Sequence, residues 1–387
     1  MSEDWITAQA AIERLGVRPQ TLYAYVSRGR VQVRADPGDP RRSLYRAVDL
    51  AALIERRTRG RKRSEVAAGA IAWGEPVMDS TITTVVGGRL FYRGRDAAVL
   101  AETETLEAVA RLLWNAPSSA RQPTPLRSML AGGLKARAFN LLASRAASDR
   151  PALGRQAAAL RLEAEDLLDA VSQAVAGDSG PGSIHLRLAS AWDVDALGAD
   201  LIRRALVLLA DHELNASTFA ARVAASTGAS LAACALAGLA TLTGPLHGGA
   251  AAGVAALLAD AARDGAQSAV TARLAEGRAI PGFGHPLYQD GDPRAQALLG
   301  RFTPAAAAQS LSAAVHEATG AAPNIDFALA AMTQAISAPA DAPFALFATA
   351  RVAGWIAHAL EQGAGGMLIR PRARYVGPHP ELMALSS

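Results

Sequence analysis

The chain has 387 residues, 50% of them hydrophobic and 19% charged, which is long enough for two or three domains with a large buried core. No apolar run reaches the roughly 18 residues of a membrane span and no signal-peptide pattern is present, so we expect a cytoplasmic protein that is neither secreted nor membrane-embedded. Cys234 is the single cysteine, which excludes an internal disulfide framework and predicts an inert, buried thiol.

Positive charge is concentrated near the start of the chain. The formal net charge is +4, but residues 1–64 alone carry fourteen Lys or Arg against seven Asp or Glu, so the remaining residues are slightly acidic. The basic run from Arg56 to Arg63 most simply forms a solvated linker. We therefore predict a domain boundary after residue 63.

The first domain begins with two predicted helices. Thr7 can cap the first helix, and Gly16 ends it. Pro19 fits the first turn of the second helix, and Gly29 ends that helix. The turn between them has the three- or four-residue length of a helix-turn-helix motif.

The next elements of this domain predict a small wing. Residues 31–34 and 43–46 flank a turn at 36–40, and a third helix is predicted at 48–57. This order resembles the winged helix-turn-helix of MerR-like and excisionase-like proteins. The resemblance implies DNA contacts from Gln20, Thr21, Tyr23 and Ala24 in the major groove and from Arg28, Arg41 and Arg42 at phosphates. The alternative is a helical module for self-association or docking, but the local positive charge favours DNA binding.

The rest of the chain is predicted to be almost entirely helical. Residues 80–95 carry β-branched and aromatic residues around Gly87-Gly88, which predicts one hairpin, and a helix follows from Thr105 to Trp114. From Leu126 onward, alanine, leucine and arginine recur at helical spacing, with stop signals between the helices and no other convincing strand pattern. We therefore predict a fold of the all-α class.

Three motifs in the second half combine histidine, glycine, aspartate and arginine. They are Gly244-Pro245-Leu246-His247-Gly248-Gly249, the segment Pro281-Gly282-Phe283-Gly284-His285 with Arg294 nine residues after the histidine, and Asn324-Ile325-Asp326-Phe327. Glycine lets a backbone approach a ligand, histidine can donate to a carbonyl, and arginine offers a fork that fits a carboxylate. Each motif alone also fits an ordinary loop or helix cap.

In this order and at this spacing, the three motifs resemble the citrate synthase family, and the resemblance extends from about Glu75 to Tyr375. It implies a catalytic trio of His247, His285 and Asp326 and a homodimer of two-domain helical subunits. By chain position, the large domain would comprise 64–248 with 338–387, and the small mobile domain 249–337.

The resemblance also implies residues that bind substrates. His212 lies on an apolar helical face, where a histidine is more often structural, but the segment 211–219 resembles the family's, in which the matching histidine contacts the dicarboxylate substrate. The implied oxaloacetate contacts are His212, Arg294, Arg351 and Arg370, and the implied CoA contacts are Pro281, Gly282, Phe283 and Gly284. The family's match to Arg370 reaches into the partner subunit's site, so we expect each site to be built from two chains.

These residues predict the condensation of acetyl-CoA with oxaloacetate, in which Asp326 is the base, His247 supports the enolate oxygen and His285 polarises the ketone. No metal or redox cofactor is expected. Gln289 stands where many family members have a basic residue, and Ala251 stands where an asparagine is common. A 2-methylcitrate synthase that uses propionyl-CoA is therefore the near alternative. A DNA-binding regulator that senses a metabolite through a synthase-like body is a further one.

Overall fold

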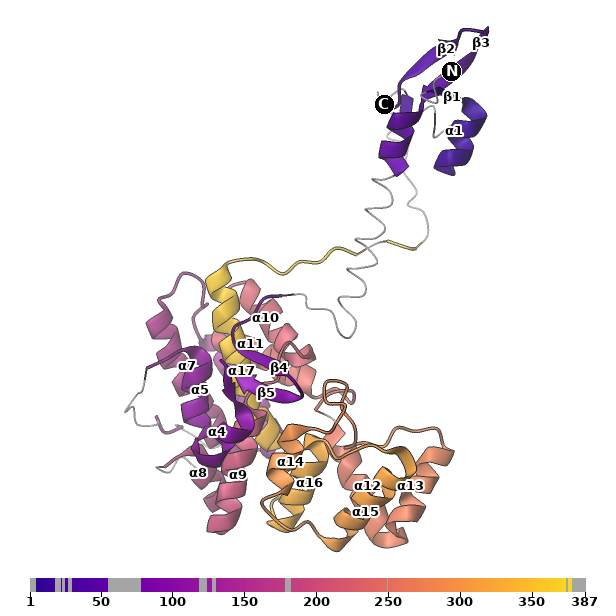
Figure 1. The fold of residues 1–387 in the computed structure, drawn as a ribbon. Helices are drawn as coiled ribbons and strands as arrows, with labels where there is room; N and C mark the ends of the chain where they lie inside the picture. Colours follow the sequence, from indigo (N-terminus) through magenta and orange to yellow (C-terminus); the bar gives the residue numbers. More distant parts are fainter. Residues whose placement is uncertain are drawn as a thin grey trace. The chain divides into compact units, whose positions relative to one another are not determined.

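The computed structural model describes residues 5–17, 22, 25–26, 30–54, 78–117, 124–126, 130–177, 182–248, 250–373 and 375–377. The chain separates into two compact units, Met1–Asp79 and Ser80–Ser387 (Figure 1). The boundary predicted after residue 63 and the basic run from Arg56 to Arg63 lie outside the described residues, so this boundary stays a prediction.

The first unit contains a three-stranded antiparallel sheet in the order β1-β3-β2. Its elements are β1 (Trp5–Thr7), α1 (Ala8–Leu15), β2 (Val33–Asp36) and β3 (Asp39–Arg46), followed by helical residues 47–54. The cap predictions are confirmed, because Thr7 accepts a hydrogen bond from the N–H of Ala10 and Gly16 ends α1 with a φ of 59°. The β2–β3 hairpin was also predicted. β1 was not, because three residues are too few to show strand periodicity.

The predicted DNA contacts remain untested. Gln20, Thr21, Tyr23, Ala24 and Arg28 lie outside the described residues, as does the side chain of Arg41. Arg42 is described, and its Nε lies 3.3 Å from Oδ2 of Asp39 in an exposed ion pair. Such a pair contributes little to stability and can be exchanged for a phosphate contact.

The second unit is a helical bundle with one small sheet, which has the order β4-β5-β6. Its strands are β4 (Thr83–Val86), β5 (Arg89–Tyr92) and β6 (Arg95–Asp96). Its helices are α4 (Ala97–Thr103), α5 (Leu106–Trp114), α6 (Leu134–Ser148), α7 (Ala157–Ala176), α8 (Ile184–Ala191), α9 (Ala196–Leu209), α10 (Ala216–Ser226), α11 (Leu231–Leu242), α12 (Ala250–Asp264), α13 (Ala266–Ala275), α14 (Pro293–Leu299), α15 (Ala306–Thr319), α16 (Ile325–Ala335) and α17 (Ala342–Gly365). Within the described residues, we find no helix both long and apolar enough to cross a bilayer.

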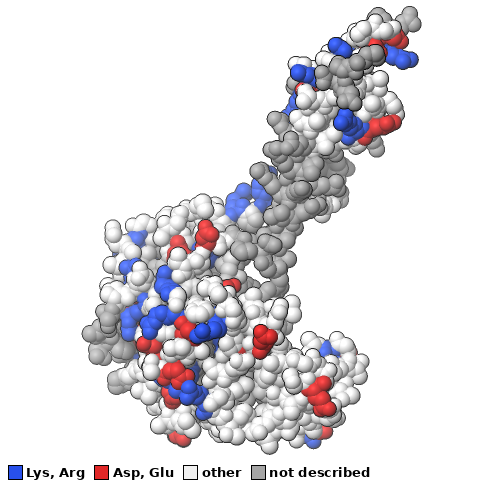
Figure 2. Space-filling view, viewed as in Figure 1, with Lys and Arg blue, Asp and Glu red and all other residues white. Residues whose placement is uncertain are grey.

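The chain is therefore mostly helical, as predicted, but it is not all-α. The hairpin at Gly87-Gly88 is confirmed, and a short third strand, β6, joins it. Each unit thus contains a small antiparallel sheet. On the face of the second unit shown in Figure 2, acidic and basic side chains lie interspersed rather than in a patch of one sign.

Two hydrophobic cores lie within the second unit, and α16 contributes to both. The larger core surrounds α17, where the side chain of Trp355 is fully buried. The smaller core is formed by α12, α13 and α15, with Phe327 and Ala331 of α16 packed against them. Leu329 and Met332 of the same helix belong to the larger core. The helix that carries Asp326 is consequently fixed between two packed layers (Figure 1).

Candidate active site

Four segments that lie far apart in the sequence meet in one cluster of aromatic and charged side chains. The rings of His212 and His285 lie edge-on, with their centres 5.1 Å apart. His247 lies edge-on to Phe347, with 6.5 Å between ring centres, and the guanidinium carbon of Arg351 lies 4.7 Å from the centre of the same ring. The cluster thus brings together residues that the sequence analysis had selected separately.

The glycine loop before His285 is hydrogen-bonded to the start of α16. The N–H of Gly284 donates to the carbonyl of Ala322 at 2.8 Å, and the N–H of Asn324 donates to the carbonyl of Gly282 at 2.8 Å. Gly282 has a φ of 87°, and a Cβ there would lie 2.9 Å from the side chain of Val254, so only glycine fits. The loop and the helix start therefore form one unit.

This pairing changes how the predicted CoA contacts can act. The N–H of Gly284 is already used within the protein, so it is not free to bind a ligand as the glycine-rich sequence suggested. Phe283 pairs with Pro323 as an isolated bridge, and its ring lies 4.9 Å from that of Phe327. Gly282 is buried and Gly284 is exposed, while Pro281 and Phe283 are half-buried. CoA binding by these four residues stays a prediction.

His285 has a defined tautomer. The N–H of Leu287 donates to Nδ1 of His285 at 3.2 Å, so Nδ1 is unprotonated and the proton of the neutral ring lies on Nε2. Burial, together with the positive charge of Arg294, lowers the pKa of His285 to about 4. At neutral pH this side chain is therefore a neutral hydrogen-bond donor through Nε2.

His212 is buried and contacts a tyrosine that the sequence analysis did not select. Its Nε2 lies 2.8 Å from the hydroxyl of Tyr288, whose ring centre is 4.8 Å from that of His285. Burial, followed by the charge of Arg294, holds the pKa of His212 well below its usual value. Burial also raises the pKa of Tyr288 to about 12. Both groups are thus neutral at physiological pH, and Tyr288 orients His212.

Arg294 is already paired with an aspartate from its own motif. Its Nε and Nη2 donate to the two carboxylate oxygens of Asp292 at 2.9 and 2.8 Å, and both side chains are buried. Asp292 also caps α14 and accepts a hydrogen bond from the N–H of Ile325 at 3.0 Å. Only Nη1 of Arg294 lacks an acceptor among the described residues. Asp292 therefore offsets much of the charge that Arg294 would offer to a substrate.

Arg351 has less of its charge compensated than Arg294, the other buried arginine of this cluster. Its Nε donates to the carbonyl of Leu209 at 3.0 Å, and no described residue accepts a hydrogen bond from its two terminal nitrogens. Burial lowers its pKa to about 10, and Asp211 opposes that shift, so Arg351 remains charged at neutral pH. A buried guanidinium with an open fork is suited to a carboxylate ligand.

Arg370 is not placed with the other candidate residues. It is exposed in the non-helical segment 366–373 after α17, and no hydrogen bond or ion pair joins it to the described residues. Of the four implied oxaloacetate contacts, His212, Arg294 and Arg351 therefore lie in the cluster of one chain, and Arg370 does not.

Asp326 has the most unusual environment of the trio. It is the second residue of α16, where the side chain of Asn324 caps the helix by accepting from the N–H of Asp326 at 3.0 Å. The Asp326 carboxylate is consequently not used as a cap, and it accepts no hydrogen bond from a described residue. Burial, aided by the negative charge of Asp292, raises its pKa to about 6 although Arg294 opposes the shift.

His247 depends on a serine for its tautomer. Its Nε2 lies 2.8 Å from the hydroxyl of Ser217, which also lies 2.7 Å from Oδ1 of Asn215 and accepts from Nε1 of Trp355 at 3.1 Å. The hydroxyl has one proton and two possible acceptors. When it donates to His247, the imidazole proton lies on Nδ1, which has no partner among the described residues. Burial and the charge of Arg351 lower the pKa of His247 to about 4.

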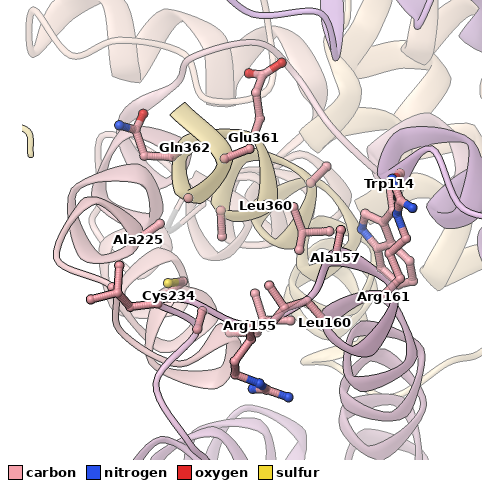
Figure 3. Close-up of a pocket in the computed structure, with 18 of the residues that line it drawn as sticks. Trp114, Arg155, Ala157, Leu160, Arg161, Ala225, Cys234, Leu360, Glu361 and Gln362 are labelled. Atoms are coloured by element: carbon pink, nitrogen blue, oxygen red, sulfur yellow. Dashed lines mark hydrogen bonds between the residues drawn. The ribbon is translucent and has the colours of Figure 1, made fainter. Parts of the chain in front are cut away.

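A cavity of about 340 Å³ lies away from this cluster, between α7, α10, α11 and the end of α17 (Figure 3). None of the predicted catalytic residues lines it. Cys234 does, and burial raises the pKa of its thiol to about 12, which agrees with the predicted inert thiol. The chemistry is therefore expected at the histidine cluster, not at this cavity.

The sequence matches a family model described as "Citrate synthase, C-terminal domain" over residues 155–372. A 2-methylcitrate synthase from Shewanella oneidensis is 30% identical over 359 residues, which cover 81% of this chain and 96% of that protein. Citrate synthase 2 from Bacillus subtilis is 38% identical over 190 residues, which cover 46% of this chain and 51% of that protein. The chain spans about half the length of this and several other curated relatives that it matches.

Solved structures share the fold. The crystal structure of citrate synthase from Thermotoga maritima aligns with a TM-score of 0.67 and 28% identity over 80% of this chain and 96% of that chain. Citrate synthase from Pyrobaculum aerophilum aligns with a TM-score of 0.63 and 26% identity over 80% of this chain and 92% of that chain.

Proposed function

The chain belongs to the citrate synthase family, and from this premise we propose that it condenses acetyl-CoA with oxaloacetate to give citrate and CoA. The carboxylate of Asp326 carries the proposal. It is half-buried among the helices, has a pKa raised to about 6 by desolvation, and accepts no hydrogen bond from a described residue. Such a group is a stronger base than an ordinary surface aspartate.

The first step removes a proton from the methyl carbon beside the thioester carbonyl. Asp326 accepts this proton, and the electron pair of the C–H bond moves toward the thioester oxygen to form an enolate. His247 stabilises that oxygen by donating from Nδ1, provided that Ser217 donates to Nε2 of the same ring. Exclusion of water strengthens both interactions, because solvent would otherwise compete for the base and the donor.

The second step forms the carbon–carbon bond. The enolate carbon attacks the ketone carbon of oxaloacetate, and the ketone oxygen gains negative charge that the Nε2–H of His285 is oriented to stabilise. Arg351, Arg294 and His212 would hold the two carboxylates. The ketone oxygen takes up one proton to become a hydroxyl, which balances the proton that Asp326 accepted in the first step and must release. Addition of one water to the thioester then releases CoA and citrate.

The acyl donor is the finer part of the proposal. The relative that aligns over 359 residues is named 2-methylcitrate synthase. 2-Methylcitrate has one methyl group more than citrate, and a propionyl donor would supply it. Gln289 and Ala251 also depart from the pattern common in the family. The test is the rate of CoA release from acetyl-CoA and from propionyl-CoA with oxaloacetate present. A higher kcat/KM with propionyl-CoA would replace the first donor by the second, and release from neither would contradict the reaction.

The proposal includes a homodimer in which Arg370 completes the partner's site. The exposed position of Arg370 in the non-helical segment after α17 supports this, because such a segment can cross a twofold axis and serve both sites equally.

Mixing two inactive variants tests this shared site. Asp326→Ala and Arg370→Ala are unfolded and refolded together, so that about half of the dimers are hetero-dimers by random pairing. If Arg370 acts in trans, each hetero-dimer has one intact site, and about a quarter of wild-type activity returns. A mixture that stays inactive although hetero-dimers have formed would contradict the shared site.

A second proposal concerns the first unit, which we propose binds duplex DNA. The antiparallel β2–β3 hairpin beside helical residues supports it, as does the excess of arginine and lysine in residues 1–64. Full-length protein should bind duplex DNA with strong salt dependence, because phosphate contacts displace counterions. Deletion of residues 1–63 should abolish this binding and leave CoA release largely intact. No DNA binding even at low salt would favour a docking role.

A further inference from the structure

The long helix α17 carries a polar face that extends well beyond the candidate site. Arg351, Gly354, His358 and Gln362 recur at intervals of three or four residues, so they lie on one side of the helix. Arg351, His358 and Gln362 are all buried, although each has a polar side chain. Arg351 faces the histidine cluster, whereas His358 and Gln362 lie further along the helix, beyond that cluster.

Arg351 and Gly354, the first two residues of this face, contact the segment that leads into His212. The carbonyl of Leu209 accepts from Nε of Arg351 at 3.0 Å, and the carbonyl of Ala210 accepts from the N–H of Gly354 at 3.0 Å. A Cβ at residue 354 would collide with the carbonyl of Ala210 and the carboxylate of Asp211, so glycine permits this close approach. The position of His212 is thus set by contact with α17.

His358 fixes the end of the same segment. Nη1 of Arg222 donates to Nδ1 of His358 at 2.9 Å, because a guanidinium has donors but no acceptor. Nδ1 is therefore unprotonated, and Nε2–H faces Oδ2 of Asp211 at 3.2 Å. Asp211, His358 and Arg222 are 0%, 1% and 3% exposed. Loss of one member would leave a buried charge or polar atom without its partner.

The network continues from Arg222 to the C-terminal segment. Nε of Arg222 donates to the side-chain oxygen of Gln362 at 3.1 Å, and Nη1 donates to Glu361 at 2.7 Å. The side-chain nitrogen of Gln362 donates to the carbonyl of Met367 at 2.9 Å, which lies three residues before Arg370. The same hydrogen-bonded chain therefore joins the segment before His212 to the segment that carries Arg370.

Glu361 anchors this network to the hairpin end of the unit. One carboxylate oxygen accepts from the N–H and the hydroxyl of Thr81, at 2.8 and 2.9 Å. Burial alone would raise the pKa of Glu361, but the hydrogen bonds from Thr81 and Arg222 lower it to about 2. Glu361 is therefore ionised at any physiological pH and balances the charge of Arg222.

We propose that His358 is a positioning residue for the dicarboxylate: it ties Asp211 to Arg222, and through Gln362 the same network holds the segment that presents Arg370. This inference rests on the proposed function, because it assigns the network to oxaloacetate binding. Its role is to hold His212 and Arg351 in place for the dicarboxylate of their own site and Arg370 in place for the dicarboxylate of the partner subunit's site. It takes no part in the proton transfers, and it does not touch the acyl donor.

Replacement of His358 tests the first half of the proposal. His358→Phe keeps the volume and removes both hydrogen bonds, while His358→Gln retains one acceptor and one donor. We expect the Phe variant to bind oxaloacetate about tenfold more weakly, with an unchanged KM for acetyl-CoA, and the Gln variant to recover to within about threefold of wild type. His316→Gln, on the exposed side of α15, is the matched control and should change neither constant.

Two results would overturn this half. Wild-type oxaloacetate affinity in the Phe variant would show that the network only supports folding. Equal weakening in the Phe and Gln variants would show that the hydrogen bonds are not what matters. Affinity is measured by calorimetry on the folded fraction, so a loss of stability alone does not imitate the expected result.

Replacement of Gln362 tests the second half and stays informative if the Phe variant does not fold. Gln362→Met removes the contacts to Arg222 and Met367 at similar volume. If Gln362 acts by holding the segment of Arg370, the substitution should weaken calorimetric oxaloacetate binding about fivefold in the wild type and have no further effect on that affinity beside Arg370→Ala. An equal effect in both backgrounds would overturn the link to Arg370.

Failure of this inference differs from failure of the proposed function. If the wild type binds oxaloacetate but releases no CoA from either donor, the reaction is wrong, and the His358 variants still test the network through affinity. If the wild type is active and the His358 variants bind oxaloacetate normally, the network alone is wrong.

Discussion

Asp211 is fully buried and Asp326 is half-buried in the same helical unit, and their pKa values shift in opposite directions. Burial favours the neutral form of both, but His358 and the charge of Arg351 lower the pKa of Asp211. Asp326 has arginine charges nearby but no hydrogen-bond donor, and its pKa rises to about 6. The comparison shows that the supply of donors, more than burial itself, decides the charge state of a buried carboxylate.

The two environments also suit different tasks. Asp211 is fully ionised and fixed by neighbours, so it can hold other residues in place but has little tendency to accept a proton. Asp326 is left poorly solvated, which destabilises its charge and makes proton uptake favourable. We expect substitutions at the two positions to separate catalysis from binding.

The largest effect is expected at Asp326. Asp326→Asn should reduce CoA release by about 10²–10⁴-fold, the usual contribution of a general base, while oxaloacetate binding is kept. Asp211→Asn should instead weaken oxaloacetate binding, because it disturbs the segment before His212. Turnover and calorimetric affinity of both variants check this contrast. Activity of Asp326→Asn within a few-fold of wild type would remove it from the mechanism.

The second effect concerns the free energy of unfolding. The pKa of Asp326 lies above its usual value of 3.8, so its contribution to stability is present below about pH 4 and is lost as the pH rises through 6. Asp326→Asn should therefore stabilise the fold at pH 8 by up to about 3 kcal/mol, and this gain should vanish near pH 4. Denaturant titrations at both pH values measure it. An equal shift at both would contradict the raised pKa.

At pH 8, where Asp326→Asn should stabilise the protein, Asp211→Asn should destabilise it. Its carboxylate is ionised in the fold and accepts a hydrogen bond from His358, so an amide would place an N–H₂ or a weaker acceptor there. The two Asp→Asn substitutions should therefore change the free energy of unfolding in opposite directions. A loss of stability in both variants would contradict the comparison.

A third effect appears in the pH profile of kcat. Asp326 must be ionised to act, whereas His247 and His285 are neutral above about pH 4. The rate should therefore fall below about pH 6, by about tenfold at pH 5, with a slope set by one group. A fall in rate near pH 6 that persists in the residual activity of a folded variant lacking Asp326 would assign this titration to another group.

The smallest effect is expected at Ser217. Ser217→Ala removes the donor that can hold the proton of His247 on Nδ1, so kcat should fall about tenfold while the KM for oxaloacetate changes little. Ser226→Ala, which removes a serine from the far end of α10, is the matched control. A change confined to KM would mean that Ser217 acts in binding instead.

The sequence predicts local structure where a single side chain decides it. Thr7 caps α1 and Gly16 ends it as predicted, and the glycine pair at 87–88 forms the predicted hairpin. The strands β1 and β6 are different, because two or three residues become strands only when a partner strand pairs with them.

The candidate site shows the same division. His247, His285 and Asp326 belong to compact motifs with recognisable spacing. Tyr288 and Ser217 had no assigned role, because their partners His212 and His247 are 76 and 30 residues away in the sequence. Asp292 could have been selected, since an aspartate two residues before an arginine at a helix start can both cap and pair.

The pairing between the glycine loop and the start of α16 has a consequence for engineering. Segments 281–285 and 322–326 are joined by three hydrogen bonds, so they form one cassette although some forty residues separate them. An exchange of the glycine loop alone, made to alter the acyl preference, would not match segment 322–326 and would shift Asp326 together with His285. Transplanting both segments as a matched set should preserve the spacing between the two groups.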